Sequence, residues 1–266
     1  MASALTILVF DSGLGGLTVH REVAAARPDA RYIYVADDAF FPYNGHSEAA
    51  LVDRIVPLMA TLIETHRPDL VIIACNTAST LVLPHLRARF ATPFVGTVPA
   101  IKPACAVSVS KRVSVLGTEA TVAREYTRAL IRDFADGCAI NLVGAPRLPE
   151  LAEAVLHGKT VSDTEIVHEI TPCFVQRNGA RTDTVVLACT HYPLLLDRLE
   201  RLSLWPVTFM DPAPAIARRV VELLGPPGRG AGPATRFIFT SGRPPSPALK
   251  GAMAGFGIAE LAAAGV

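Results

Sequence analysis

The amino-acid sequence predicts an α/β protein with parallel sheets, arranged as two pseudo-equivalent halves. Strand-length runs of β-branched residues alternate with helical segments through almost all of the 266 residues, which is the pattern of parallel sheets with helices on both faces. Two of the runs end alike, in Ala-Cys followed by residues with amide or hydroxyl side chains, at Cys75 and Cys189. Each half also opens with a strand and a loop that leads into a helix, over residues 7–13 and 113–121. The chain therefore repeats one structural plan.

The expected strands are short and mostly apolar. In chain order they cover residues 5–10, 32–36, 70–74, 94–96, 112–117, 139–143, 184–188, 207–210 and 236–240. We expect the halves to separate near residues 99–103 and the last strand to return to the first half. The expected domains are then 1–98 plus 212–266, which is discontinuous, and 99–211.

Helical segments lie between these strands, at residues 47–66, 121–134, 163–177 and 212–224. Ser47 is a suitable N-cap for the first of them, because a serine hydroxyl accepts a hydrogen bond from a free N–H group of the first turn. Apolar residues such as Leu51, Ile55 and Met59 fall on one face of this helix. Pro57 lies inside it and is expected to kink or break it.

Composition excludes several classes of partner. The 25 basic and 24 acidic residues give a formal net charge of +1, which favours neither nucleic acid nor an anionic membrane as partner. The apolar runs are too short to cross a bilayer, and the first ten residues resemble a first strand more than a signal peptide. The five Cys residues show no Cys-x-x-Cys spacing, which indicates free thiols in a reducing cytoplasm.

The two repeated thiols are the strongest functional candidates. Each follows a buried strand at the end where open α/β sheets place their ligands. Each also precedes a helical stretch, and a helix N-terminus favours the thiolate that acts as a base. A free Cys is often only a small buried apolar residue, but the repeated context favours function for Cys75 and Cys189. Two thiols on opposite faces of one substrate can remove a proton and return it on the other side, as in a cofactor-independent racemase. Cys105, Cys138 and Cys173 lack this context and are expected to be structural.

Other candidates lie near the strand ends. The loop from Asp11 to Thr18 is glycine-rich and leads into a helix, so it could hold an anion such as a carboxylate. Its spacing is not Gly-x-Gly-x-x-Gly, so a nucleotide is weakly supported. Asp11 could hold a thiol proton or a substrate ammonium group. His191 could relay protons to Cys189 with Glu153 orienting it, or could simply be a polar capping residue.

The joint pattern of motifs resembles the glutamate racemases, of the aspartate/glutamate racemase family, over about residues 5–224. The motifs that carry the resemblance are Phe10-Asp11-Ser12-Gly13-Leu14-Gly15-Gly16-Leu17-Thr18-Val19, Pro42-Tyr43, Ala74-Cys75-Asn76-Thr77-Ala78-Ser79, Pro99-Ala100-Ile101-Lys102-Pro103, Gly117-Thr118-Glu119-Ala120-Thr121 and Cys189-Thr190-His191-Tyr192-Pro193.

This resemblance implies reversible conversion of L- and D-glutamate without pyridoxal phosphate, a metal or a nucleotide, which supplies D-glutamate for peptidoglycan. It implies two flavodoxin-like domains with the active site in the cleft between them, and a homodimer. Cys75 and Cys189 would be the acid/base thiols, assisted by Asp11 and by His191, and Glu153 would support His191. Residues expected to bind the substrate are Ser12, Asn76, Thr77, Thr118, Thr121 and Thr190, with backbone amides near Pro42, Tyr43 and Asn44 for the side-chain carboxylate.

The sequence departs from the family pattern near the expected distal carboxylate pocket. Where the family usually has Pro-Tyr-Gly and then a basic residue, this chain has Asn44-Gly45-His46, and Asp38 replaces a usual Thr or Ser. A racemase for aspartate, a hydantoin or a related diacid therefore stays open. So do a thiol hydrolase that uses Cys189 and His191 but does not need Cys75, and an amino-acid-binding protein without turnover.

Overall fold

The computed structural model describes residues 5–135, 137–258 and 260–261. Expectations for residues 1–4, 136, 259 and 262–266, which include the ends of the first expected domain, lie outside this part of the chain. Helices and parallel strands alternate as the sequence predicted, and no helix among the described residues is long and apolar enough to cross a membrane.

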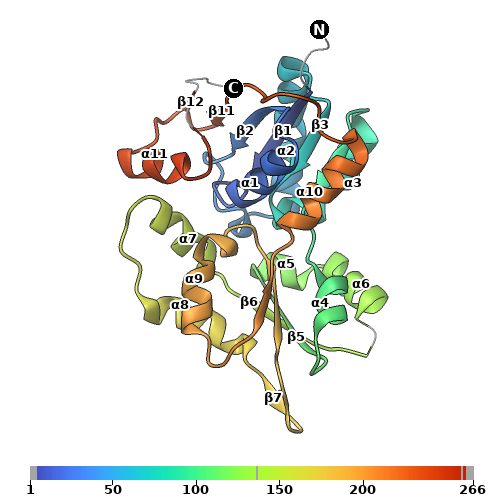
Figure 1. Cartoon of the computed structure of the whole chain (residues 1–266), viewed down its shortest axis with the longest axis vertical. Helices are drawn as coiled ribbons and strands as arrows, with labels where there is room; N and C mark the ends of the chain where they lie inside the picture. The colour runs from blue at the N-terminus through green and yellow to red at the C-terminus, as the bar shows by residue number, and fades with distance from the viewer. Residues whose placement is uncertain (1–4, 136, 259, 262–266) are drawn as a thin grey trace.

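Two parallel sheets form the framework (Figure 1). The first has the order β12-β11-β2-β1-β3-β4, and its strands are β1 (Thr6–Asp11), β2 (Arg31–Ala36), β3 (Leu70–Ile73), β4 (Phe94–Gly96), β11 (Arg236–Phe239) and β12 (Glu260–Leu261). The second has the order β10-β9-β5-β6, and its strands are β5 (Arg112–Gly117), β6 (Ala139–Gly144), β9 (Thr184–Ala188) and β10 (Thr208–Met210). The predicted return of a late strand is confirmed, because β11 pairs in parallel with β2.

Alternating side chains of each central strand pack on opposite faces of its sheet. In β1, Ile7 and Val9 belong to one core cluster, whereas Leu8 and Phe10 belong to another. The helices on the first face are α1 (Leu17–Ala26), α10 (Ala213–Leu224) and α11 (Pro247–Ala254), and those on the second are α2 (Glu48–His66) and α3 (Asn76–Arg89). Both faces of the first sheet are therefore buried, as an apolar parallel sheet requires.

The second sheet follows the same rule. Val185 and Leu187 of β9 pack on one side of it, and Val186 and Ala188 pack on the other. The first side is covered by α7 (Leu148–Leu156), α8 (Asp163–Ile170) and α9 (Leu196–Leu202), and the second by α4 (Ile101–Val107) and α6 (Glu125–Phe134). Figure 1 shows this sheet and its helices below the first sheet.

Two helix predictions need correction. The segment 121–134 is two helices, α5 (Glu119–Ala123) and α6, because Arg124 between them is extended. The Thr121 carbonyl accepts its hydrogen bond from the Thr127 hydroxyl instead of from the next turn of a helix.

The segment 163–177 leaves α8 at Ile170 and enters a 3-10 turn, η2 (Thr171–Cys173), where Pro172 has no N–H group to continue the helix. It then reaches β7 (Gln176–Arg177), which forms a two-stranded antiparallel hairpin with β8 (Ala180–Arg181).

The expected cap of α2 is confirmed, since the Ser47 hydroxyl accepts a hydrogen bond from the Ala50 N–H group. A break at Pro57 does not occur, because α2 continues through it. Pro57 lies on the exposed face of α2, and Asp53, whose carbonyl loses its helical donor at Pro57, is exposed too. Water can therefore satisfy the carbonyl that the proline leaves without a partner.

Candidate active site

The carboxyl ends of β1, β3, β5 and β9 surround one small cavity between the two sheets. Its volume is about 20 Å³, which is room for about one water molecule, so it must widen to admit an amino acid. Phe41 and Pro149 line it without having been predicted. The predicted residues that line it are Ser12, Pro42, Tyr43, Asn44, Cys75, Asn76, Thr77, Thr118, Cys189, Thr190 and His191. Asp11, Thr121 and Glu153 lie behind this lining.

Cys75 enters the cavity from the first sheet as the N-cap residue of α3, as predicted. Its sulfur accepts a hydrogen bond from the Ser12 hydroxyl at 3.4 Å. Burial raises the pKa of the Cys75 thiol to about 12, and the nearby Asp11 charge acts in the same direction, whereas the Ser12 hydrogen bond opposes them. Cys75 is therefore a protonated thiol near neutral pH.

Asp11 lies behind Cys75 and is fully buried. Its Oδ2 atom accepts hydrogen bonds from the N–H groups of Gly13 at 3.2 Å and Gly16 at 3.0 Å, and from the Tyr34 hydroxyl at 3.3 Å. Its Oδ1 atom has no protein partner among the described residues. Burial raises the pKa of Asp11, although the charge of His191 and the bonds from Gly16 and Gly13 oppose this. The carboxyl group thus has one satisfied oxygen and one oxygen that is free for a proton or an ammonium group.

Cys189 enters the cavity from the second sheet. The sequence predicted that an α-helix starts directly after it, and this prediction is wrong. The chain first forms a 3-10 turn, η3 (Tyr192–Leu195), in which the Tyr192 N–H group donates to the Cys189 carbonyl, and α9 begins only at Leu196. The Cys189 sulfur lies 3.8 Å from Nδ1 of His191. A histidine side chain thus takes the place that a helix N-terminus was expected to fill.

His191 is held between Cys189 and Glu153, with its Nε2 atom 2.9 Å from Glu153 Oε1. Burial lowers the pKa of His191, but its hydrogen bonds and charge interactions with Cys189 and Glu153 outweigh burial and raise it well above the usual value. The imidazole is therefore protonated near neutral pH. The protonated ring lies directly against the Cys189 sulfur.

The glycine loop after β1 packs directly against this pair. Glu153 Oε1 also accepts a hydrogen bond from the Leu14 N–H group at 2.7 Å. A Cβ atom on Gly15 would lie 2.5 Å from His191 Nδ1 and 2.7 Å from the His191 backbone nitrogen. Glycine is therefore required at position 15 because the second half of the molecule approaches the loop so closely.

Polar side chains on the other side of the cavity suit the α-amino and α-carboxylate groups of an amino acid. The amide oxygen and nitrogen of Asn76 are buried and have no protein partner among the described residues, which favours a ligand as their partner. The hydroxyls of Thr77, Thr118 and Thr121 lie 2.9 to 3.3 Å from one another. Thr121 thus acts on the cavity through its two neighbours, and Thr190 lines the cavity directly.

The distal side of the cavity is a 3-10 turn, η1 (Tyr43–Gly45), preceded by Phe41 and Pro42. The Phe41 ring lies 5.6 Å from the His191 ring between centroids. The side-chain amide of Asn44 donates to the Pro146 carbonyl at 3.3 Å, so it links the two halves. The first N–H groups of a helical turn have no acceptor within the turn, and those of Tyr43 and Asn44 are therefore suited to a carboxylate.

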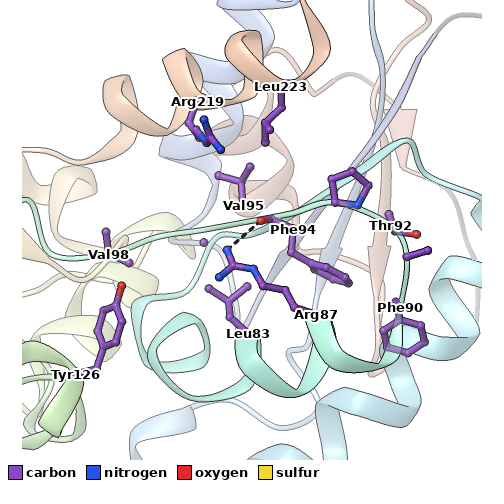
Figure 2. Close-up of a pocket in the computed structure, with 13 residues that line it drawn as sticks. Leu83, Arg87, Phe90, Thr92, Phe94, Val95, Val98, Tyr126, Arg219 and Leu223 are labelled. Atoms are coloured by element: carbon purple, nitrogen blue, oxygen red, sulfur yellow. Dashed lines mark hydrogen bonds between the residues drawn. The ribbon is translucent and has the colours of Figure 1, made fainter.

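A larger cavity lies elsewhere and contains none of the predicted site residues. It measures about 550 Å³ and is lined by residues around β4, the end of α3 and α10. Figure 2 shows Arg87 there, donating to the Phe94 carbonyl at 3.1 Å, with Arg219 across from it.

Within the described ranges, no group of three or more His, Cys, Asp or Glu side chains could hold a metal ion.

Comparison with known proteins places this geometry in a family. Residues 17–220 match the family model described as Asp/Glu/Hydantoin racemase. A glutamate racemase from Brucella anthropi is 52% identical over 95% of this chain and 92% of the relative. A solved Escherichia coli glutamate racemase, in complex with L-glutamate and the activator UDP-MurNAc-Ala, is 39% identical with a TM-score of 0.88 and covers 97% of both chains. A Thermus thermophilus glutamate racemase, solved with β-chloro-D-alanine, is 26% identical with a TM-score of 0.75 over 98% of this chain and 97% of that one. The chain therefore belongs to the Asp/Glu/Hydantoin racemase family.

Proposed function

We propose that this protein interconverts L- and D-glutamate by passing protons between its two cavity thiols. One observation carries the proposal: Cys75 and Cys189 line the same cavity from different sheets, Cys75 as a buried protonated thiol and Cys189 against the protonated His191 ring. A two-base exchange needs one thiolate and one thiol at the start of each turnover. The similarity to glutamate racemases supports glutamate as the substrate.

The first step uses the thiolate of Cys189. It removes the α-proton from one face of the substrate and becomes a thiol, while the electron pair of the C–H bond stays on the α-carbon and its carboxylate. The Cys75 thiol then donates its proton to the opposite face and becomes a thiolate. The product is the mirror image of the substrate, and the same steps in reverse convert it back.

The α-carbanion is the difficult species in this reaction. Donors that are already oriented toward the developing charge lower the barrier more than water does, because they need no reorganisation. Asn76 and the threonine hydroxyls are such donors, since their polar atoms lie buried at the cavity. The free Oδ1 atom of Asp11 and the N–H groups of Tyr43 and Asn44 suit the ammonium group and the distal carboxylate.

The test is circular dichroism of D-glutamate incubated with purified protein and no added cofactor. The signal should decay to zero as the solution becomes racemic. A panel containing aspartate and a hydantoin separates glutamate from the other substrates of this family. If D-glutamate keeps its full signal while aspartate loses its own, glutamate is the wrong substrate.

Finer assignments are part of the same proposal. The two domains are 1–98 with 212–266, and 99–211, which agrees with the membership of the two sheets. The enzyme acts as a homodimer in the cytoplasm, where its D-glutamate supplies peptidoglycan; the five free cysteines support a reducing compartment. Light scattering of the purified protein tests the dimer.

A further inference from the structure

Asp37 is a buried carboxylate that does not line the thiol cavity but contacts the turn that does. It follows β2, and its side chain is fully enclosed. Tyr43, which opens the turn η1 at the cavity, donates its hydroxyl to Asp37 Oδ2 at 2.8 Å. Arg54 of α2 donates to both carboxylate oxygens, at 2.5 and 3.1 Å. The Thr240 hydroxyl, just beyond β11, donates to Oδ1 at 2.7 Å.

These contacts fix the position of the Tyr43 side chain. A buried carboxylate needs hydrogen-bond donors, and bonds to a charged group are about twice as strong as neutral ones. Asp37 therefore joins α2, the end of β11 and the turn η1 through bonds that are costly to leave unmade. The Tyr43 ring is itself buried in the second core cluster, so the turn has little freedom to move away.

The rest of the segment 39–46 is tied to the same partners. The Thr240 hydroxyl accepts a hydrogen bond from the Ala39 N–H group at 3.3 Å, and the Arg54 guanidinium lies 5.8 Å above the centre of the Phe40 ring. His46 stacks on Phe40 with ring centroids 3.8 Å apart. Both ends of the segment therefore connect to the group around Asp37, and the segment is expected to move as one unit.

We propose that Asp37 is a positioning residue that sets the place of the substrate's distal carboxylate, and that Thr240 sets the place of Asp37. This inference rests on the proposed function, because the distal carboxylate is that of glutamate. It assigns a role in substrate binding to the end of β11, whose residues do not line the cavity.

Thr240 offers a sharper test than Asp37, because a change at Asp37 leaves Arg54 without its buried partner and endangers folding. Thr240→Val removes the hydroxyl and keeps the shape, whereas Thr240→Ser keeps the hydroxyl. Loss of a hydrogen bond to a buried charge should raise KM for both glutamate enantiomers about 10-fold in Thr240→Val, with kcat within about twofold of wild type. Thr240→Ser should keep the wild-type KM.

Ser241→Ala is the matched control. The Ser241 hydroxyl lies next to Thr240 in the chain but donates to Asp38 rather than to Asp37. Its loss should leave KM unchanged. An equal rise of KM in Ser241→Ala and Thr240→Val, or a loss of kcat with unchanged KM in Thr240→Val, would overturn the proposal.

Amide hydrogen exchange in the ligand-free protein tests the hydrogen bond from Thr240 to Asp37 without any substrate. Exchange in residues 39–46 should be faster in Thr240→Val than in wild type and unchanged in Thr240→Ser. Unchanged exchange in Thr240→Val overturns the proposal even if wild type racemises glutamate. Failure of wild type to racemise glutamate refutes the proposed function instead. Faster exchange in Thr240→Val without a rise in KM overturns the proposal, because the hydrogen bond from Thr240 to Asp37 then does not serve substrate binding.

Discussion

Replacing Glu153 with Gln should lower kcat roughly 30-fold near pH 8. Glu153 Oε1 accepts hydrogen bonds from His191 at 2.9 Å and from Leu14 at 2.7 Å, and its side chain is only 13% exposed, so water screens these bonds weakly. A bond to a charged group contributes about 1.5–3 kcal/mol and a neutral one about 0.5–1.5 kcal/mol. Losing the charge therefore costs each bond about 1 kcal/mol, and about 2 kcal/mol in total is roughly a 30-fold change in rate.

The pH dependence identifies the cause of the loss. Glu153 helps to raise the pKa of His191, so the protonated imidazole should persist as the pH rises in wild type. In Glu153→Gln that pKa falls, and kcat should decline at a lower pH than in wild type while recovering in part toward acid pH. The assay is circular dichroism at a series of pH values.

Glu150→Gln is the matched control, because Glu150 lies on the same helix and is exposed. It should behave like wild type. The equilibrium constant of a racemisation is unity, so kcat/KM must fall by the same factor for both enantiomers. This equality tests whether each data set is internally consistent. A loss of the same factor at every pH would refute the role assigned to His191.

The remaining predictions concern packing and stability. Gly15→Ala should lose at least about 10-fold in activity, because its Cβ would overlap the His191 ring and backbone. Gly251→Ala, in α11 and away from the cavity, has open space and should keep wild-type activity; equal losses in the two variants would contradict this. Burial lowers the pKa of His20 to about 4, so the unfolded chain takes up a proton first as the pH falls below about 6.5. The free energy of unfolding should therefore fall by roughly 3 kcal/mol between pH 6.5 and 4; chemical denaturation of wild type and His20→Gln measures it, and parallel curves for the two proteins would refute it.

Most strands could be predicted because their signal is local. β-Branched runs such as those of β3 and β9 are buried on both faces, and their residues need only strand length and apolar character to be recognised. The boundaries of α5, α6 and α8 were predicted less well, since they depend on particular contacts. The Thr127 hydroxyl, for example, reaches back to the Thr121 carbonyl, and no periodicity of apolar residues reveals this.

Most residues that line the cavity directly follow the ends of β1, β3, β5 and β9, which is why the sequence could indicate them. Tyr34 and Asp37 were missed as supporting residues because their importance lies in hydrogen bonds to Asp11 and Tyr43 that only the folded chain forms. Phe41 was missed because a single aromatic residue in a loop has no local signature. The helix expected after Cys189 was wrong because Pro193 lies in the short 3-10 turn that precedes α9.

The most direct test of the two-thiol exchange is mass spectrometry of glutamate after reaction in deuterated water. With wild type, starting from either enantiomer, the mirror-image product should carry one deuterium at the α-carbon, because the donating thiol has exchanged its proton with solvent. Cys75→Ala and Cys189→Ala should each form no mirror-image product. Full racemisation by either variant, or a wild-type product without deuterium, would contradict the account.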